Sequence, residues 1–400
     1  MKRKYWIYVS LSAFCLVLTS CQSQDSSVVE PSTAIMYKAV ETTFKGKIDL
    51  NNLENYSAQP IPTYITKDNT TVNPITNAGA TLGRVLFYDK KLSVNNTVSC
   101  ATCHKQALAF GSDDVVSSGV NGNTTRHTMR LVNARFTTEV RAFWDKRAAS
   151  IEDQATQPVK NHNEMGFSGQ NGDPGIDSLI NKLSAINYYK ELFTFVYGSP
   201  EITETKIKDA IAQFVRSIQS FDTKYDEGRA QVNNNNAPLP NFTALENQGK
   251  ALFTNRPQFN QSGVRIGGGA GCDGCHRAPE FDIDPNSKDN GVTTVAGDPS
   301  QNDYTNTNPP SLRNLFNPNG NINGPLMHNG AFNNFDAVLN HYNSIIVDPA
   351  NTNLDRRLAP AGHGQQLRLT QQERDALTAF LKTLTGTDVY TNPKWSDPFN

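Results

Sequence analysis

Cysteine, net charge and long apolar segments are all scarce in this chain of 400 residues. Its six cysteines are too few for a small domain held together by disulfides. Lys and Arg number 37 and Asp and Glu number 38, so the chain lacks the positive excess typical of nucleic-acid-binding proteins. Hydrophobic residues make up 37%, which supports a folded core. We therefore expect a globular protein, without nucleic acid as a partner, that is long enough for two domains of roughly 100–200 residues each.

The main apolar run lies at the start of the chain. Residues 1–20 have a basic start followed by an apolar stretch from Tyr5 to Leu18, and the sequence LTSC then ends at Cys21. This stretch is shorter than the ~20 residues of a membrane span, so a lipoprotein signal peptide is favoured over a short transmembrane anchor. The pattern predicts an exported, periplasm-facing lipoprotein, anchored to a bacterial membrane through a lipid on Cys21. Residues 21–75 are rich in Ser, Thr, Asn and Pro, which indicates a tether and a loosely structured lead-in.

Four further cysteines fall in two copies of one motif. Residues 100–104 read CATCH and residues 272–276 read CDGCH, and C-x-x-C-H is the attachment signature of c-type haem. Two thiols one helical turn apart meet the two vinyl groups of one porphyrin, and the next residue supplies the proximal iron ligand. A thioredoxin-like redox dithiol would need only one such motif, in a βαβ unit, and a zinc site made of all four cysteines would leave both histidines without a role. The motifs predict two covalently bound haem c groups on these residues: Cys100, Cys103 and His104, and Cys272, Cys275 and His276.

The regular segments are mostly helical. Apolar residues keep helical spacing over 176–197 and 203–221. Thr243 with Glu246 and Thr370 with Glu373 have the spacing of capping boxes that open two more helices, and Gly386 is a candidate end for the second. No convincing run of alternating strand residues is present.

A polar, proline-containing stretch at 233–240 separates the two haem motifs and predicts a domain boundary. The expected fold is mainly α, with two cytochrome c-like haem domains in tandem. The N-terminal domain would cover residues 76–232 and the C-terminal domain residues 241–390.

Further motifs accompany the two haem signatures: LGRVLFYD at 82–89, FWDKRA at 143–148, Gln154, Pro158, EMG at 164–166, PSLRN at 310–314, HNG at 328–330 and LKTLTG at 381–386. Through these motifs, the sequence resembles the bacterial di-haem cytochrome c peroxidases and their MauG-type relatives over residues 76–386. Such a resemblance implies that the C-terminal haem takes electrons from a small donor protein, a cytochrome c or a cupredoxin. It also implies that the C-terminal haem passes these electrons to the N-terminal haem, where hydrogen peroxide is reduced to water.

The resemblance also implies roles for individual residues. Glu164 stands where the family has its distal glutamate, and a partly desolvated carboxyl suits proton transfer between the two peroxide oxygens. Gln154 and Pro158 match distal pocket residues, and Trp144 matches the position between the haems, where an indole can relay an electron. His162 is a competitor for the acid–base role, and the alternative for Glu164 is a solvated loop carboxylate.

The chain departs from the family at two positions of the N-terminal half. Many members close the first haem with a histidine in a Ser-x-Gly-His loop, whereas residues 117–120 read SSGV here, and Val120 cannot ligate iron. His127 and Met129 are either substitute ligands or scaffold, and scaffold is favoured. His127 also replaces an Asn that helps to hold a calcium ion between the haems in the family. A bound calcium is therefore less strongly predicted here, although Asn308 and the backbone near Pro310 could still bind it.

The distal ligand of the second haem is expected at Tyr342. Peroxidases of the family usually have Met at this position and MauG-type proteins have Tyr. A helix capped by Asn334 would place Tyr342 on its apolar face. His341 and Met327 are the alternatives, as is a Tyr342 buried only for packing.

We therefore expect a peroxidase that uses hydrogen peroxide and a small donor protein. A MauG-type oxidase that acts on a protein or other substrate, and a di-haem electron carrier without chemistry, are the alternatives. Homodimer formation is left open.

Overall fold

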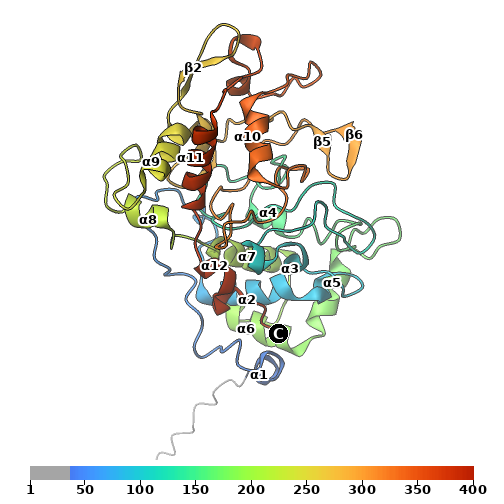
Figure 1. Ribbon diagram of the computed structural model, residues 1–400. Helices are drawn as coiled ribbons and strands as arrows, with labels where there is room; N and C mark the ends of the chain where they lie inside the picture. Colours follow the sequence, from blue (N-terminus) through green and yellow to red (C-terminus); the bar gives the residue numbers. More distant parts are fainter. Residues whose placement is uncertain (1–36) are drawn as a thin grey trace, which may run out of the picture. The chain divides into compact units, whose positions relative to one another are not determined.

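The computed structural model describes residues 37–400, so the predicted signal peptide and Cys21 lie outside the described residues. Helices make up most of the regular structure, as predicted (Figure 1). The α-helices are α1 (Lys38–Phe44), α2 (Asn77–Tyr88), α3 (Cys100–Cys103), α4 (Ile151–Ala155), α5 (Ile176–Ser184), α6 (Asn187–Tyr197), α7 (Glu204–Ser217), α8 (Lys224–Arg229), α9 (Ala244–Thr254), α10 (Phe335–Asn343), α11 (Gln371–Lys382) and α12 (Asp388–Thr391). Short 3₁₀ turns lie at Lys90–Leu92, Gln106–Leu108, Cys272–Gly274, Arg356–Leu358, Pro360–Gly362 and Pro393–Trp395.

Three small antiparallel hairpins lie in the C-terminal half, where the sequence shows no strand pattern. Their strands have two to five residues, which is too short for a visible alternation of apolar and polar side chains. The pairs are β1 (Pro257–Phe259) with β2 (Arg265–Gly268), β3 (His276–Arg277) with β4 (Asp282–Ile283), and β5 (Thr294–Val295) with β6 (Asp298–Asn302).

The predicted helix starts are confirmed. Thr243 and Thr370 each form a capping box, with Glu246 and Glu373 respectively. The predicted segment 176–197 is two helices, because the chain becomes extended at Ile186 between α5 and α6. Helix α11 ends at Lys382, well before Gly386. A Cβ on Gly386 would lie 2.1 Å from Asp222 Oδ1, so this glycine permits a close contact rather than ending the helix.

The first cluster of buried apolar residues surrounds α2 and α7, which pack side by side (Figure 1). Their crossing needs a glycine, because a Cβ on Gly83 would lie 1.9 Å from the carbonyl oxygen of Ala210 and 2.8 Å from Phe214 Cβ. The close approach brings the two helix backbones together directly behind the first haem motif, where Phe87 lies 6.3 Å from the His104 ring.

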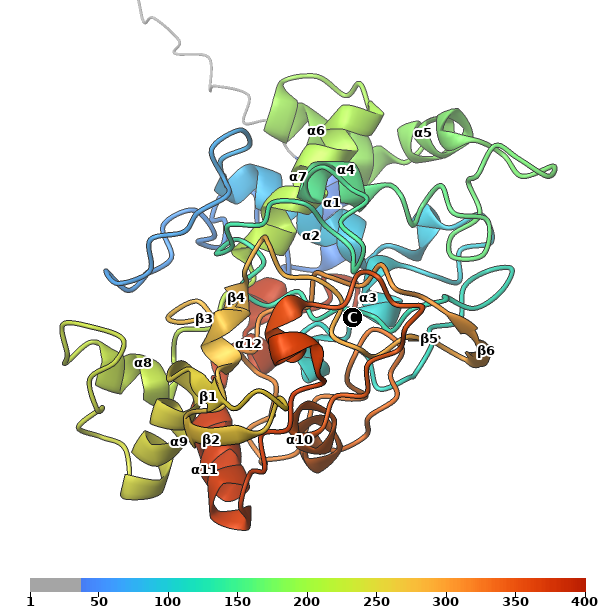
Figure 2. The ribbon, with the colours of Figure 1, turned by 90° about the horizontal axis from the view of Figure 1, so that it is seen from above.

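The second cluster surrounds α9 and α11, which also lie side by side (Figure 2). A Cβ on Gly249 would lie 1.8 Å from the Ala376 carbonyl oxygen and 2.8 Å from Phe380 Cβ. The same combination of a glycine, an alanine carbonyl and a phenylalanine four residues later thus occurs in both halves. The same type of helix crossing in both halves fits the expected pair of similar haem domains. The limits of the two domains remain a proposal.

Several apolar side chains of residues 37–75, a part of the expected lead-in, pack into the first cluster. Val40 and Tyr56 are buried there. The amides at the start of α1 are held by the Glu191 carboxylate, which accepts from the Ala39 and Val40 N–H groups at 3.0 and 2.9 Å. The composition of this segment is polar, but a few apolar side chains suffice to fix it. The end of the chain returns to the same cluster through Trp395.

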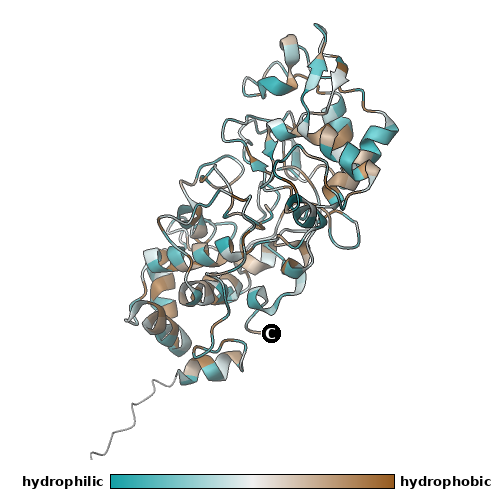
Figure 3. Cartoon of the chain, turned by 90° about the vertical axis from the view of Figure 1, so that its left-hand side faces the viewer, coloured by the Kyte–Doolittle hydropathy of each residue, from teal (hydrophilic) through white to brown (hydrophobic). Residues whose placement is uncertain are grey.

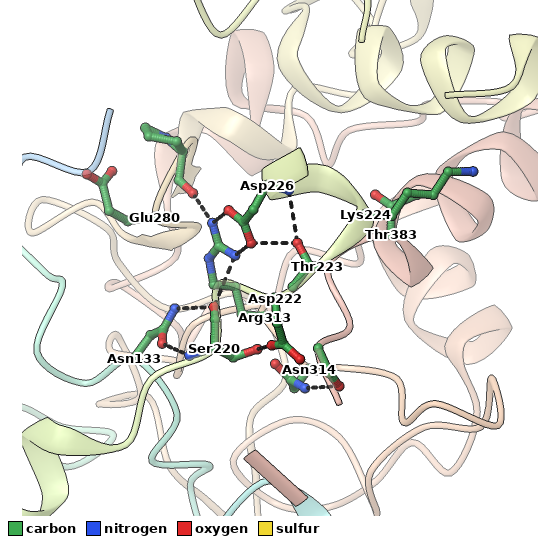
Figure 4. A network of polar contacts seen from close by, with 12 residues as sticks. Asn133, Ser220, Asp222, Thr223, Lys224, Asp226, Glu280, Arg313, Asn314 and Thr383 are labelled. Carbon is green, nitrogen blue, oxygen red and sulfur yellow. Dashed lines mark hydrogen bonds and ion pairs between the residues drawn. The ribbon is translucent and has the colours of Figure 1, made fainter. Parts of the chain in front are cut away.

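A buried ion pair joins α8 to the loop that contains the PSLRN motif (Figure 4). The Arg313 side chain is 0% exposed, and its two terminal nitrogens donate to the Asp226 carboxylate at 2.7 and 2.9 Å. Arg313 also donates to the carbonyl oxygens of Ser220 and Pro279. Ser220 in turn bonds to Asn133 from the N-terminal half, so this network ties the two halves together.

The helices carry apolar and polar residues on different faces (Figure 3). In residues 37–400, no helix combines the length and the apolar character that a membrane crossing requires.

Replacing Arg313 tests the junction between the halves. Arg313→Met leaves the Asp226 carboxylate buried without its partner, and breaking a buried pair from one side costs about 3–5 kcal/mol. We expect the free energy of unfolding, measured by denaturant titration with circular dichroism, to fall by about that amount.

An exposed ion pair provides the control. Glu201, whose side chain is 71% exposed, pairs with Lys206, and Glu201→Gln should cost no more than about 1 kcal/mol. Equal effects of the two substitutions would contradict the role given to Arg313.

Candidate functional site

The first haem motif forms one helical turn, α3, opened by a capping box between Ser99 and Thr102. Cys100 and Cys103 of this turn both line one cavity of the protein, which is described below. The chain then turns sharply through Ala109 and Phe110, both of which have a left-handed backbone. The turn returns the Phe110 carbonyl to the His104 ring.

His104 has the hydrogen bonding of an iron ligand. Its Nδ1 lies 3.1 Å from the Phe110 carbonyl oxygen, which can only accept. The proton is thereby placed on Nδ1, and Nε2 is left free to ligate a metal. Burial lowers the pKa of His104 to about 4, so the imidazole is neutral at physiological pH, the form that binds a metal.

One cavity contains the first motif and the residues predicted to act with it. It is lined by Cys100, Cys103 and His104 from the motif. Four residues from later segments line the same cavity: Trp144, Gln154, Pro158 and Glu164. Sequence positions more than 60 residues apart are thus brought together around one space, at the place expected for the first cofactor.

The Glu164 carboxyl lies in a desolvated environment within this cavity. Burial raises the pKa of Glu164, and the nearby Arg147 guanidinium opposes that shift. Its negative charge also acts to raise the pKa of the Cys100 and Cys103 thiols, which puts the carboxyl near the motif. A carboxyl with a raised pKa can accept and return a proton close to neutral pH.

The loop that contains Val120 packs directly on the segment that holds Glu164. The Val120 N–H donates to the Glu164 carbonyl oxygen at 3.0 Å, and the Asn121 N–H donates to the Asn163 carbonyl oxygen at 3.1 Å. A Cβ on Gly119 would lie 2.6 Å from Glu164 Cα, so only glycine permits this approach. The loop therefore fixes the backbone of the acid instead of offering a side chain to iron.

Trp144 is buried, and its backbone and ring are both held. Its indole N–H donates to the His127 carbonyl oxygen at 2.8 Å, and its ring lies 6.2 Å from the His328 ring. Its carbonyl oxygen accepts from the N–H groups of Thr307 and Asn308 in the C-terminal half. The indole therefore lies where the two halves meet.

Of the residues considered as alternatives, His127 and Met129 line the cavity, whereas His162 does not. His162 is exposed and pairs with Asp173 at 2.7 Å, outside the lining of the cavity. His127 is buried with its Nδ1 2.9 Å from the Asp114 carbonyl oxygen, in agreement with a scaffold role. In residues 37–400, no group of three or more His, Cys, Asp or Glu side chains is arranged to hold a metal ion.

The second motif begins in the 3₁₀ turn Cys272–Gly274 and ends in β3, where His276 pairs with Ile283 of β4. Burial lowers the pKa of His276 to about 4, so this imidazole is also neutral. Its Nδ1 is buried and has no hydrogen-bond partner among the described residues. The carbonyl contact that orients His104 therefore has no counterpart at His276.

Tyr342 and Met327, the two candidate ligands, converge on one amide. Asn290 Nδ2 donates to Tyr342 Oη at 3.2 Å and lies 3.4 Å from Met327 Sδ. Burial raises the pKa of the Tyr342 hydroxyl, and the hydrogen bond from Asn290 opposes that shift. The predicted cap on α10 is confirmed, since the Asn334 side chain accepts from the Ala337 N–H at 2.9 Å. His341 is directed elsewhere, with Nε2 2.8 Å from the Asn290 carbonyl oxygen.

Sequence reasoning gave no role to three polar residues of these sites, although Arg147 lies within the FWDKRA motif. Arg147 and Arg130 line the first cavity, and Asn290 contacts Tyr342. None belongs to a motif with a fixed spacing to the cysteines, and their positions depend on tertiary packing. The residues present nevertheless fit two haem groups, because each C-x-x-C-H segment combines two thiols with a neutral, buried imidazole.

Three comparisons agree with this reading. The family described as "Di-haem cytochrome c peroxidase" matches residues 77–234. The methylamine utilization protein MauG of Methylorubrum extorquens is 30% identical over 324 residues, which cover 78% of this chain and 79% of that protein. The cytochrome-c peroxidase IdrP1 of Denitromonas iodatirespirans is 28% identical over 80% of this chain and 86% of its own length.

A solved structure is similar over almost its whole length. The crystal structure of a MauG-like protein associated with microbial copper homeostasis superposes with a TM-score of 0.64 at 26% identity. The match covers 85% of this chain and 99% of that one.

The number of attached porphyrins tests the assignment of both motifs. We expect the intact protein to carry the mass of two porphyrins and two irons per chain, and the double variant Cys100→Ala/Cys103→Ala to lose one porphyrin. The matched variant Cys272→Ala/Cys275→Ala should lose the other. A wild-type chain with bound zinc and no porphyrin would overturn the assignment.

Proposed function

We propose that this chain, which belongs to the family of di-haem cytochrome c peroxidases and MauG-type proteins, reduces hydrogen peroxide to water. The electrons would come from a small donor protein, a cytochrome c or a cupredoxin. The observation that carries the proposal is the single cavity in which the first haem motif meets Glu164 and Gln154. The bound haem would supply an iron that exchanges electrons with peroxide.

Proton transfer is the task of the protein side chains. Reduction of one peroxide consumes two electrons and two protons and yields two waters. The Glu164 carboxylate can take the proton from the peroxide oxygen nearer the first haem site. It can return that proton to the other oxygen, which leaves as water. Gln154 carries both a donor and an acceptor to orient the substrate. The Pro158 ring adds an apolar wall.

Peroxide would enter without prior reduction of the protein. Val120 stands where many relatives place a gating histidine, and its hydrocarbon side chain cannot ligate iron. Its backbone is engaged with Glu164. We propose that the first iron is open in the fully oxidised protein.

Trp144 is the proposed relay for electrons between the two haems. A buried indole at the meeting of the two halves, in ring contact with His328, supports this role. The division into an N-terminal domain of residues 76–232 and a C-terminal domain of residues 241–390 belongs to the same proposal.

A MauG-type oxidase is the second candidate, and Tyr342 favours it. A phenolate ligand would lower the potential of the second haem, because a hard anionic oxygen stabilises ferric iron. Steady-state turnover with peroxide and a reduced cytochrome c separates a peroxidase from such an oxidase. A simple electron carrier needs no polar distal pocket, so Glu164 and Gln154 speak against it.

Export to the periplasm, the lipid on Cys21, a bound calcium and homodimer formation stay predictions. Asn308, a candidate calcium ligand, uses its Nδ2 to donate to the carbonyl oxygens of Arg141 and Phe143.

Glu164→Gln removes the titratable proton and keeps the size of the side chain. General acid–base catalysis is typically worth about 10²–10⁴-fold, and we expect peroxide turnover to fall by that factor with both haems still attached. Because burial raises the pKa of Glu164 and the first step needs the carboxylate, wild-type turnover should fall as the pH drops through a value above the usual glutamate range. This limb of the pH profile should vanish in the variant.

Asp177→Asn is the matched control, since Asp177 is an exposed carboxylate outside the cavity. It should leave both turnover and the pH profile unchanged. If Glu164→Gln also left turnover and its pH profile unchanged, Glu164 would be a structural carboxylate only.

Tyr342→Phe tests the second iron. If Tyr342 is the ligand, the substitution removes the phenolate oxygen, so the low-spin ferric signal of the second haem should change in electron paramagnetic resonance and its potential should rise. An unchanged signal and potential would exclude Tyr342 as a ligand and remove the support for the MauG-type alternative.

A further inference from the structure

Arg130 lies between the first haem site and the C-terminal half. Its side chain lines the cavity of the first motif. Its aliphatic part packs on Gly111, where a Cβ would lie 2.8 Å from Arg130 Cγ. Its Nη2 donates to the Ser311 carbonyl oxygen, at 3.2 Å, in the PSLRN segment. The side chain is therefore in contact with both halves of the chain, and its guanidinium bonds to the C-terminal half.

This guanidinium differs from the other arginines around the cavity. Arg126, Arg141 and Arg147 each have a carboxylate partner within 3.0 Å. Arg130 has no carboxylate within 4.0 Å in residues 37–400, and its Nε is buried without a hydrogen-bond partner there. Burial lowers the pKa of Arg130 to about 10, which still leaves it charged at neutral pH. A buried charge without a counterion is costly, so the site calls for an anion.

A carboxylate matches the guanidinium best. The planar fork of Arg binds a carboxylate through two parallel hydrogen bonds, and such charge-assisted bonds are the strong ones. Each haem c group has two propionate carboxylates, and the cavity that Arg130 lines is the one expected to hold the first haem. The hydrogen bond from Arg130 to Ser311 also puts the guanidinium next to the C-terminal half, so a propionate of either haem is a candidate partner.

We propose that Arg130 is a cofactor-binding residue whose guanidinium holds a haem propionate at the junction of the two haem sites. The inference rests on haem attachment and not on the reaction with peroxide. A positive charge fixed beside a haem favours the reduced iron by Coulomb attraction, so Arg130 raises the potential of the haem whose propionate it binds. It thereby biases the direction in which an electron passes between the two haems.

Potentiometric titration of the di-haem protein, followed by absorption spectroscopy, tests the inference without any turnover. In Arg130→Gln we expect a lower midpoint potential for one haem, with two porphyrins still attached. A shift of the first haem assigns the propionate to the N-terminal site, and a shift of the second assigns it to the C-terminal site. Unchanged potentials of both haems would overturn the proposal.

Arg141→Gln is the matched control, because Arg141 lines the same cavity but has Glu139 as its partner. Arg141→Gln should leave the midpoint potentials of both haems unchanged. A shift as large as that of Arg130→Gln would show that any loss of positive charge has this effect, which would contradict the proposal. Arg130→Lys keeps the charge and covers the case in which Arg130→Gln does not fold. It should largely retain the potential but change the propionate bending bands in resonance Raman, whereas unchanged bands would refute a direct bond.

Discussion

A carboxyl group kept away from water beside the first haem motif is the constraint on which the N-terminal half depends. Glu164 would be hydrated, with an ordinary pKa, if its segment were free. Instead the loop at residues 117–121 holds the backbone on either side of Glu164 through two hydrogen bonds and the close approach of Gly119. Burial then raises the pKa of Glu164 towards the range useful for proton transfer. In our proposal, the absence of a gating ligand and the position of the acid both follow from this one loop.

Two arginines, Arg313 and Arg130, show how the halves are joined. Arg313 carries its own counterion, Asp226, and contributes to the fold whatever else is bound. Arg130 has no such partner among the described residues, and we assign its counterion to a cofactor. Arg313 would hold the two halves together whether or not haem is bound. The contacts of Arg130 would be complete only when the haem groups are attached. Cofactor attachment and assembly of the two halves are coupled in this account.

Much of the chemistry could be predicted because it lies in short contiguous patterns. The two C-x-x-C-H motifs need no tertiary information, and the capping residues Thr243, Thr370 and Asn334 act within one turn. The break between α5 and α6 could not be read, because apolar residues keep helical spacing across it. Gly83 and Gly249 look ordinary in the sequence, and only the crossing of two helices shows what they permit. The packing of residues 37–75 and the isolation of Arg130 likewise depend on distant segments.

Rapid mixing of the fully oxidised wild-type protein with one equivalent of hydrogen peroxide tests the central claim most directly. An open first iron beside a positioned acid predicts an immediate change in the haem absorption spectrum, with no reductant present. A spectrum that changes only after the second haem has been reduced would contradict the account, because the first site would then be closed in the resting protein.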